Sequence, residues 1–112
     1  MDKQIKNLKE LSEIAGVSGF ETRVKELLLK RLESACESVE YDKLGSIIFK
    51  TKNNNAELKI LLAAHMDEVG FMVKTITEQG FLRFTCLGGW WEQVMLGQRV
   101  IVHADQGDLI VI

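Results

Sequence analysis

The chain has 112 residues and a formal net charge of −2, from 14 lysines and arginines against 16 aspartates and glutamates. This mild acidity is spread along the sequence, so no basic stripe indicates a nucleic-acid partner. The longest apolar stretches are far shorter than the ~18 residues of a membrane span, and residues 1–4 lack the apolar region of a signal peptide. Cys36 and Cys86 are too few for a disulfide framework, so we expect reduced thiols in a cytoplasmic protein with no membrane partner.

Two helices are predicted at the start of the chain. Apolar residues recur at near-helical spacing over residues 3–15, and the glycines within 16–19 interrupt this pattern. Ser18 is followed three residues later by Glu21, which fits a capping box, so a second helix is expected to begin near Gly19. The residues expected to face inward from this helix are Val24, Leu27, Leu28 and Leu32.

Short strands joined by turns are predicted over most of the remaining chain. A hairpin is expected where residues 42–45 separate the strand-like residues 39–41 and 46–50, because a glycine there can supply a positive backbone angle. Three asparagines at 53–55 are expected to form a loop. The later strands are predicted at 70–76, 81–86, 99–103 and 109–112, with tight turns at 78–80 and 105–107.

The apolar run at residues 58–64 ends abruptly at His65, Asp67 and Glu68. Such a run is typical of a strand buried on both faces of a parallel or mixed sheet. Ligands bind beyond the carboxyl ends of such strands, and in an extended chain His65 and Asp67 would point to the same side. The histidine could then ligate a metal ion and the aspartate could orient it. A single histidine after an apolar strand can also be an ordinary polar residue that has reached solvent.

Five segments, one of which contains His65 and Asp67, occur in a characteristic order that covers nearly the whole chain. They are LSEIAGVSGFE at 11–21, DKLGS at 42–46, AAHMDEVGFMV at 63–73, LGGWWEQ at 87–93 and LGQRV at 96–100. Together they resemble the tetrahedral (TET-type) metallo-aminopeptidases, also called glutamyl or deblocking aminopeptidases and sometimes labelled endoglucanase-M-like. Several separate matches in sequence order are far more specific than one histidine.

The resemblance implies an α/β fold. Residues 1–69 would form the amino-terminal part of a three-layer αβα zinc-peptidase domain, with two helices and a mixed sheet. Residues 70–112 would begin a small inserted domain, β-rich and PDZ-like, through which the family dimerises. Family members are much longer and return to the catalytic domain after this insertion, so we expect the chain to be a fragment.

The resemblance also implies a chemistry. His65 would coordinate one metal ion, and Asp67 would be the catalytic acidic residue that holds a ligand in orientation. The complete enzyme would use two divalent metal ions, zinc or cobalt, to release single residues from the amino end of short peptides. The remaining ligands and the general-base glutamate would lie beyond residue 112, so we expect the chain alone to be inactive. Dimers would assemble into a tetrahedral dodecamer.

Other interpretations of the same residues remain open. The competing hypothesis is a non-catalytic truncated module that keeps only folding and self-association surfaces. An endoglucanase would need two carboxylates flanking a glycosidic bond, and no such pair stands out; we favour a structural role for residues 88–91. Glu68 is either a functional part of the motif or a structural carboxylate, and His103 is expected at the surface. A thiol hydrolase using Cys86 and His103 has no further support in the sequence.

Overall fold

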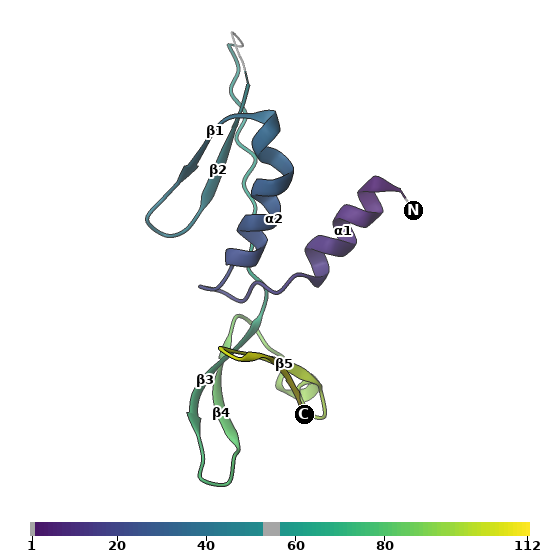
Figure 1. Ribbon diagram of the computed structural model, residues 1–112, viewed down its shortest axis with the longest axis vertical. Helices are drawn as coiled ribbons and strands as arrows, with labels where there is room; N and C mark the ends of the chain where they lie inside the picture. Colours follow the sequence, from purple (N-terminus) through teal and green to yellow (C-terminus); the bar gives the residue numbers. More distant parts are fainter. Residues whose placement is uncertain (1, 53–56) are drawn as a thin grey trace.

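The computed structural model describes residues 2–52 and 57–112, in which two helices are followed by three β-hairpins (Figure 1). The loop predicted at 53–55 lies outside the described residues. The helices are α1 (Lys3–Glu13) and α2 (Thr22–Leu32), with single 3-10 turns η1 (Glu33–Ala35) and η2 (Glu92–Val94). The strands are β1 (Cys36–Tyr41), β2 (Ile47–Thr51), β3 (Gly70–Ile76), β4 (Leu82–Leu87), β5 (Val100–Ala104) and β6 (Gly107–Val111).

Both predicted helices form, but the boundary of the second was wrong. The Asp2 side chain accepts a hydrogen bond from the Gln4 amide and so caps α1. The capping box at Ser18 is absent: the Glu21 carboxylate accepts from the Gly19 amide at 2.8 Å, and α2 begins only after Glu21, which has no side-chain cap. Because the Glu21 carboxylate binds the Gly19 amide in the turn before the helix, α2 starts three residues later than predicted.

Three antiparallel hairpins contain all six strands of the described residues: β1–β2, β3–β4 and β5–β6. The predicted turns are confirmed, and the turn residues Gly45 and Gly107 have φ angles of 96° and 119°, which disfavour a residue with a Cβ. The observed strands differ from the predicted ones by three residues or fewer at each end. The alternation of apolar and polar residues between turn signals was therefore a sufficient guide to the hairpins.

The buried central strand predicted at residues 58–64 is not present in this structure. The segment has no strand assignment, and its side chains are exposed, with Leu58 at 75% and Leu62 at 91% of full exposure. Figure 1 shows it as a thin teal trace between the β1–β2 hairpin and β3. A strand needs a hydrogen-bonded neighbour, and in the described residues the only parallel pairing nearby is an isolated bridge between Val17 and Glu68. The predicted mixed sheet is thus replaced by separate hairpins.

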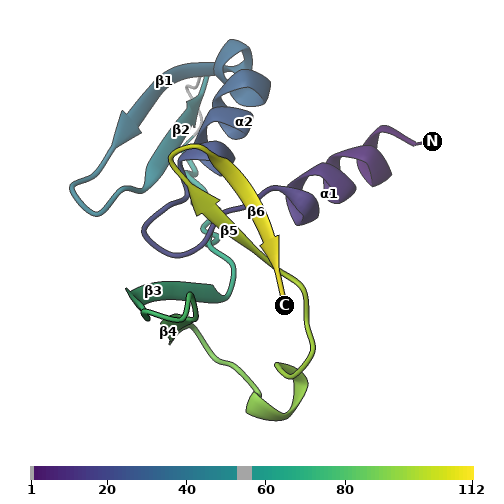
Figure 2. The same cartoon turned by 60° about the horizontal axis from the view of Figure 1, so that its bottom comes forward.

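The described residues are arranged as an elongated body rather than around one core. Its principal extents are 63 × 37 × 30 Å and its radius of gyration is 18.1 Å, against about 13 Å for a compact domain of this length. Val24 on α2, at 6% exposure, is the one buried apolar side chain among the described residues. Figure 1 shows α2 with β1–β2 in the upper half of the view and β3, β4 and β5 in the lower half, and Figure 2 shows the β5–β6 hairpin in yellow. No described helix has the length and hydropathy needed to cross a membrane.

Asp42 organises the turn of the β1–β2 hairpin. One carboxylate oxygen accepts from the amides of Leu44 at 2.8 Å and Ser46 at 2.7 Å, and the other accepts from the Ser46 hydroxyl at 2.7 Å. The Ser46 hydroxyl first, then the Ser46 amide and smaller contributions from Leu44 and Gly45, hold the pKa of Asp42 below its usual value of 3.8. The turn is thus stabilised by the ionised aspartate.

We expect a carboxyl-carbon NMR titration of Asp42 to give a midpoint below 3.8. Because the folded pKa is lowered, the turn is fully stabilised above the usual value and loses this contribution as the pH falls through the lowered one. Ser46→Ala removes the largest cause of the lowering and should move the midpoint back toward 3.8. An unchanged midpoint in Ser46→Ala would contradict this account of the turn.

Candidate metal-binding site

The candidate site lies where the segment before β3, which has no regular secondary structure, meets the loop between the two helices. Glu68 forms the isolated parallel bridge with Val17, and β3 begins two residues later at Gly70. Gly16 and Gly70 are both buried at this junction. The chain therefore leaves the exposed segment 58–64 and enters a well-packed contact within a few residues, and His65 lies directly between the two.

His65 and Asp67 lie together, as their spacing predicted. The His65 Nδ1 atom is 2.9 Å from the backbone oxygen of Asp67 and 3.0 Å from its carboxylate Oδ1. A backbone oxygen can only accept, so Nδ1 must carry the proton and donate it. In the neutral imidazole the other ring nitrogen, Nε2, then has a free lone pair, the form in which a histidine binds a metal ion. The His65 side chain is 85% exposed, so the crevice expected at the edge of a covered sheet is not formed by the described residues.

The Glu68 side chain contacts the loop between the two helices. Its Oε1 atom accepts a hydrogen bond from the Gly16 amide at 2.9 Å, and its own amide donates to the Gly16 carbonyl at 2.8 Å. Of the two interpretations left open by the sequence, the structure supports the structural carboxylate. Gly16 was missed as a partner because it is 52 positions away, and no local pattern relates residues at that separation.

The described residues provide one oriented imidazole and not a complete metal site. No group of three His, Cys, Asp or Glu side chains within 2–52 and 57–112 could hold an ion together. A catalytic zinc usually takes three protein ligands and one water. The described residues thus provide a single candidate ligand, His65, whose ring is oriented by Asp67. The metal-binding role of His65 and the orienting role of Asp67 stay predictions.

The chain is similar to known proteins over most of its length. Residues 45–112, which include His65 and Asp67, match the family model described as M42 glutamyl aminopeptidase. The chain belongs to this M42 family. It is 43% identical to the glutamyl aminopeptidase of Lactococcus lactis subsp. cremoris over 105 residues, which are 92% of this chain and 29% of that protein. The resemblance deduced from the motifs is confirmed.

Solved structures agree with the assignment to the M42 family. The TET aminopeptidase from the marine sediment archaeon Thaumarchaeota archaeon SCGC AB-539-E09 superposes with a TM-score of 0.88 at 45% identity, covering 97% of this chain and 30% of that one. The Pyrococcus horikoshii TET1 peptidase, described as assembling into a tetrahedron or a large octahedral shell, superposes with a TM-score of 0.83 at 32% identity, covering 96% and 32%. The M42 chain thus spans about a third of the length of its relatives.

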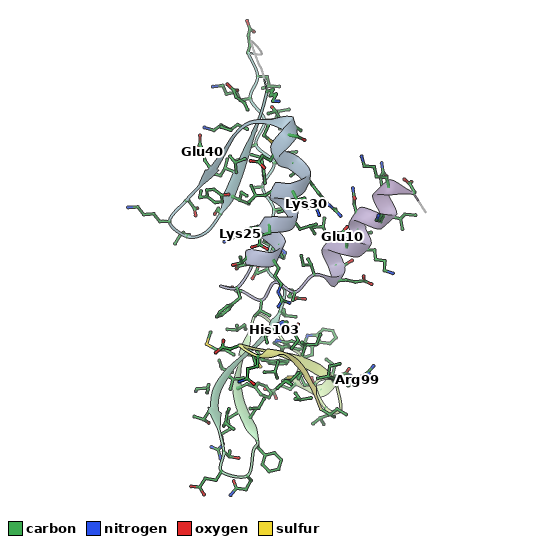
Figure 3. The ribbon with its side chains drawn as sticks, viewed as in Figure 1. Glu10, Lys25, Lys30, Glu40, Arg99 and His103 are labelled. Carbon is green, nitrogen blue, oxygen red and sulfur yellow. The ribbon has the colours of Figure 1, made fainter. Side chains whose placement is uncertain are left out.

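His103, the second histidine of the M42 chain, forms a hydrogen bond within the β5–β6 hairpin. Figure 3 labels it on the β5–β6 ribbon, where its Nδ1 atom lies 2.7 Å from Asp108 Oδ1 on the paired strand. Arg23 at the start of α2 forms an ion pair with the same carboxylate at 3.5 Å. The hydrogen bond from His103, with a smaller contribution from Arg23, lowers the pKa of Asp108. His103 is partly exposed, which agrees with its predicted surface position.

The tryptophan pair of the M42 chain divides into one structural and one exposed residue. Trp90 donates its indole N–H to the Gly70 carbonyl at 3.0 Å and stacks on Phe71 with ring centroids 4.5 Å apart. Trp91 is largely exposed. The structural role favoured for residues 88–91 is therefore found for Trp90, which holds the first residues of β3.

Proposed function

We propose that this chain is part of a metal-dependent aminopeptidase that releases amino-terminal residues from short peptides. The observation that supports this most directly is the His65 imidazole, held at Nδ1 by Asp67 with Nε2 open to solvent, in a chain of the M42 family. Neither family membership nor one ligand alone would define the reaction. Together they favour metal-assisted hydrolysis of the bond next to a free amino terminus.

In this proposal His65 is a metal ligand and Asp67 orients it. Two divalent ions, zinc or cobalt, would polarise the scissile carbonyl and lower the pKa of a water molecule. The proton of that water must pass to the leaving amine through a carboxylate base. Glu68 is a poor candidate for that base, because its carboxylate is bound to the Gly16 amide. The base and the remaining ligands would be contributed from outside these 112 residues.

We further propose the domain assignment and the assembly. Residues 1–69 would belong to a three-layer catalytic α/β domain, in which segment 58–64 would acquire strand neighbours from outside the described residues. Residues 70–112 would begin a PDZ-like dimerisation domain, and dimers would form a tetrahedral dodecamer in the cytoplasm. The start of the β3–β4 hairpin at Gly70 and the described assembly of the P. horikoshii relative support this organisation.

The activity is tested with the full-length gene product, loaded with Zn²⁺ or Co²⁺ and supplied with aminoacyl chromogenic substrates. We expect release of the chromophore from substrates with a free amino group and no release from the acetylated forms, because the amino terminus is part of the recognised group. The isolated 112-residue chain should be inactive in the same assay, since it provides one ligand of the site.

Two results would contradict the proposal. Cleavage of a soluble cellulose derivative without any cleavage of peptides would favour the endoglucanase interpretation. Absence of any hydrolysis, together with self-association measured by sedimentation, would favour the non-catalytic module.

A further inference from the structure

Glu68 and Gly16 are joined by two hydrogen bonds that run in opposite directions. The Glu68 amide donates to the Gly16 carbonyl at 2.8 Å, and the Gly16 amide donates to the Glu68 carboxylate at 2.9 Å. The second bond is partly buried and joins residues 52 positions apart in the sequence. This pair is therefore a specific link between the segment that carries His65 and the loop between α1 and α2.

The loop side of this link is itself held in place. Gly16 is buried, and a Cβ added to it would lie 2.6 Å from Cγ2 of Val24 and 3.5 Å from the backbone oxygen of Met66. Val24 is the buried residue of α2. Gly16 is thus packed between α2 and the segment before β3, and it offers Glu68 an anchor with little freedom to move.

The peptide group between Asp67 and Glu68 connects Gly16 to the imidazole of His65. The amide of Glu68 and the carbonyl of Asp67 belong to one planar peptide unit. Its N–H donates to the Gly16 carbonyl, and its oxygen accepts from His65 Nδ1 at 2.9 Å. The orientation of this plane therefore determines where the His65 ring can make its hydrogen bond, and with it the direction of Nε2.

We propose that Glu68 is a positioning residue. Its carboxylate binds the Gly16 amide and holds Gly16 where the Gly16 carbonyl accepts from the Glu68 amide. This second bond fixes the Asp67–Glu68 peptide plane, and the fixed plane directs the imidazole of His65. The positioning of the ring follows from contacts in the chain itself, whereas its consequence for a bound ion rests on the proposed metal-dependent function. The role requires a hydrogen-bond acceptor at the position of Oε1 and does not require a negative charge.

The test compares Glu68→Gln with Glu68→Asp in the metal-free full-length gene product. Glutamine keeps the length of the side chain and an acceptor oxygen, whereas aspartate keeps the charge but is one methylene too short to reach Gly16. Long-range ¹H–¹⁵N NMR reports the tautomer of His65. We expect Glu68→Gln to keep the Nδ1-protonated form as the dominant one and Glu68→Asp to give a mixture of both tautomers.

Metal affinity gives the second measurement, with Co²⁺ as the probe and its absorption spectrum as the signal. Outer residues that orient a ligand typically contribute about 10–100-fold to metal affinity, so Glu68→Asp should weaken Co²⁺ binding by that factor and Glu68→Gln by much less. The opposite order, with aspartate close to wild type and glutamine impaired, would show that charge is what matters and would overturn the proposal. A single dominant tautomer in Glu68→Asp would overturn it as well.

The two measurements separate this proposal from the proposed function. If His65→Ala binds Co²⁺ as tightly as wild type, the metal role of His65 fails, while the tautomer comparison still decides whether Glu68 directs the ring. If His65→Ala loses the ion but neither Glu68 variant alters the tautomer, the function stands and the positioning role fails.

Discussion

Replacing His65 by alanine should abolish the peptidase activity of the full-length gene product. Residues that only orient a ligand contribute about 10–100-fold to metal affinity or activity, so loss of the ligand itself should lower kcat/KM by more than about 100-fold. The physical reason is that alanine offers no donor in place of Nε2, the nitrogen that the Asp67 contacts leave free. The measurement is kcat/KM on an aminoacyl substrate, together with Co²⁺ affinity by absorption.

His103→Ala is the matched control, because it removes the other histidine of the chain. That ring is bound to Asp108 on the β5–β6 hairpin and is not part of the candidate site. We expect it to keep metal affinity and activity near the wild-type values. Equal losses in the two variants would show that the histidines act through overall folding, and full activity in His65→Ala would remove the basis of the proposed site.

Of the substitutions proposed here, replacing Gly70 by alanine should lower the free energy of unfolding the most. A Cβ at Gly70 would lie 2.6 Å from Cγ2, 2.8 Å from Cγ1 and 3.3 Å from Cβ of Val17. Because both methyl groups and the branching carbon are close, rotation of the stiff valine side chain cannot relieve the clash. Overpacking of this kind costs about 1–3 kcal/mol, measured as the free energy of unfolding in urea.

Gly89→Ala provides the control within the same chain. A Cβ there has no heavy atom within 4 Å, and the backbone of Gly89 is not in the left-handed region, so stability should change little. The double variant Val17→Ala with Gly70→Ala should recover part of the loss, because it removes the methyl groups that clash. A Gly70→Ala protein as stable as wild type would show that this junction is looser than described.

Hairpins were the part of the fold that local reasoning predicted best. The range 70–76 predicted for one strand coincides with β3, and the turns with Gly45 and Gly107 lie where expected. In a hairpin the partner strand is adjacent in sequence, so alternation and turn residues contain most of the necessary information. The start of α2 was missed because Glu21 has a competing partner in the preceding turn.

Segment 58–64 is a place where prediction from local sequence was wrong, because the predicted strand is not formed. Its apolar composition predicted a buried strand, but burial needs a covering surface and strand formation needs a hydrogen-bonded partner, and the described residues provide neither. Hydrophobicity is a property of the segment. Pairing is a property of what surrounds it.

By itself, the sequence determined the family, the hairpins and the proximity of His65 to Asp67, because each depends on residues that are close in the chain or on motifs that occur in order. Only the tertiary structure decided that the Glu68 carboxylate binds the Gly16 amide, and that Val17 packs against Gly70. These contacts join residues about 50 positions apart, and their formation depends on how α2 and the preceding loop pack against the start of β3. The candidate ligand His65 can therefore be identified from the sequence, whereas the contacts that hold it in place are seen only in the tertiary structure.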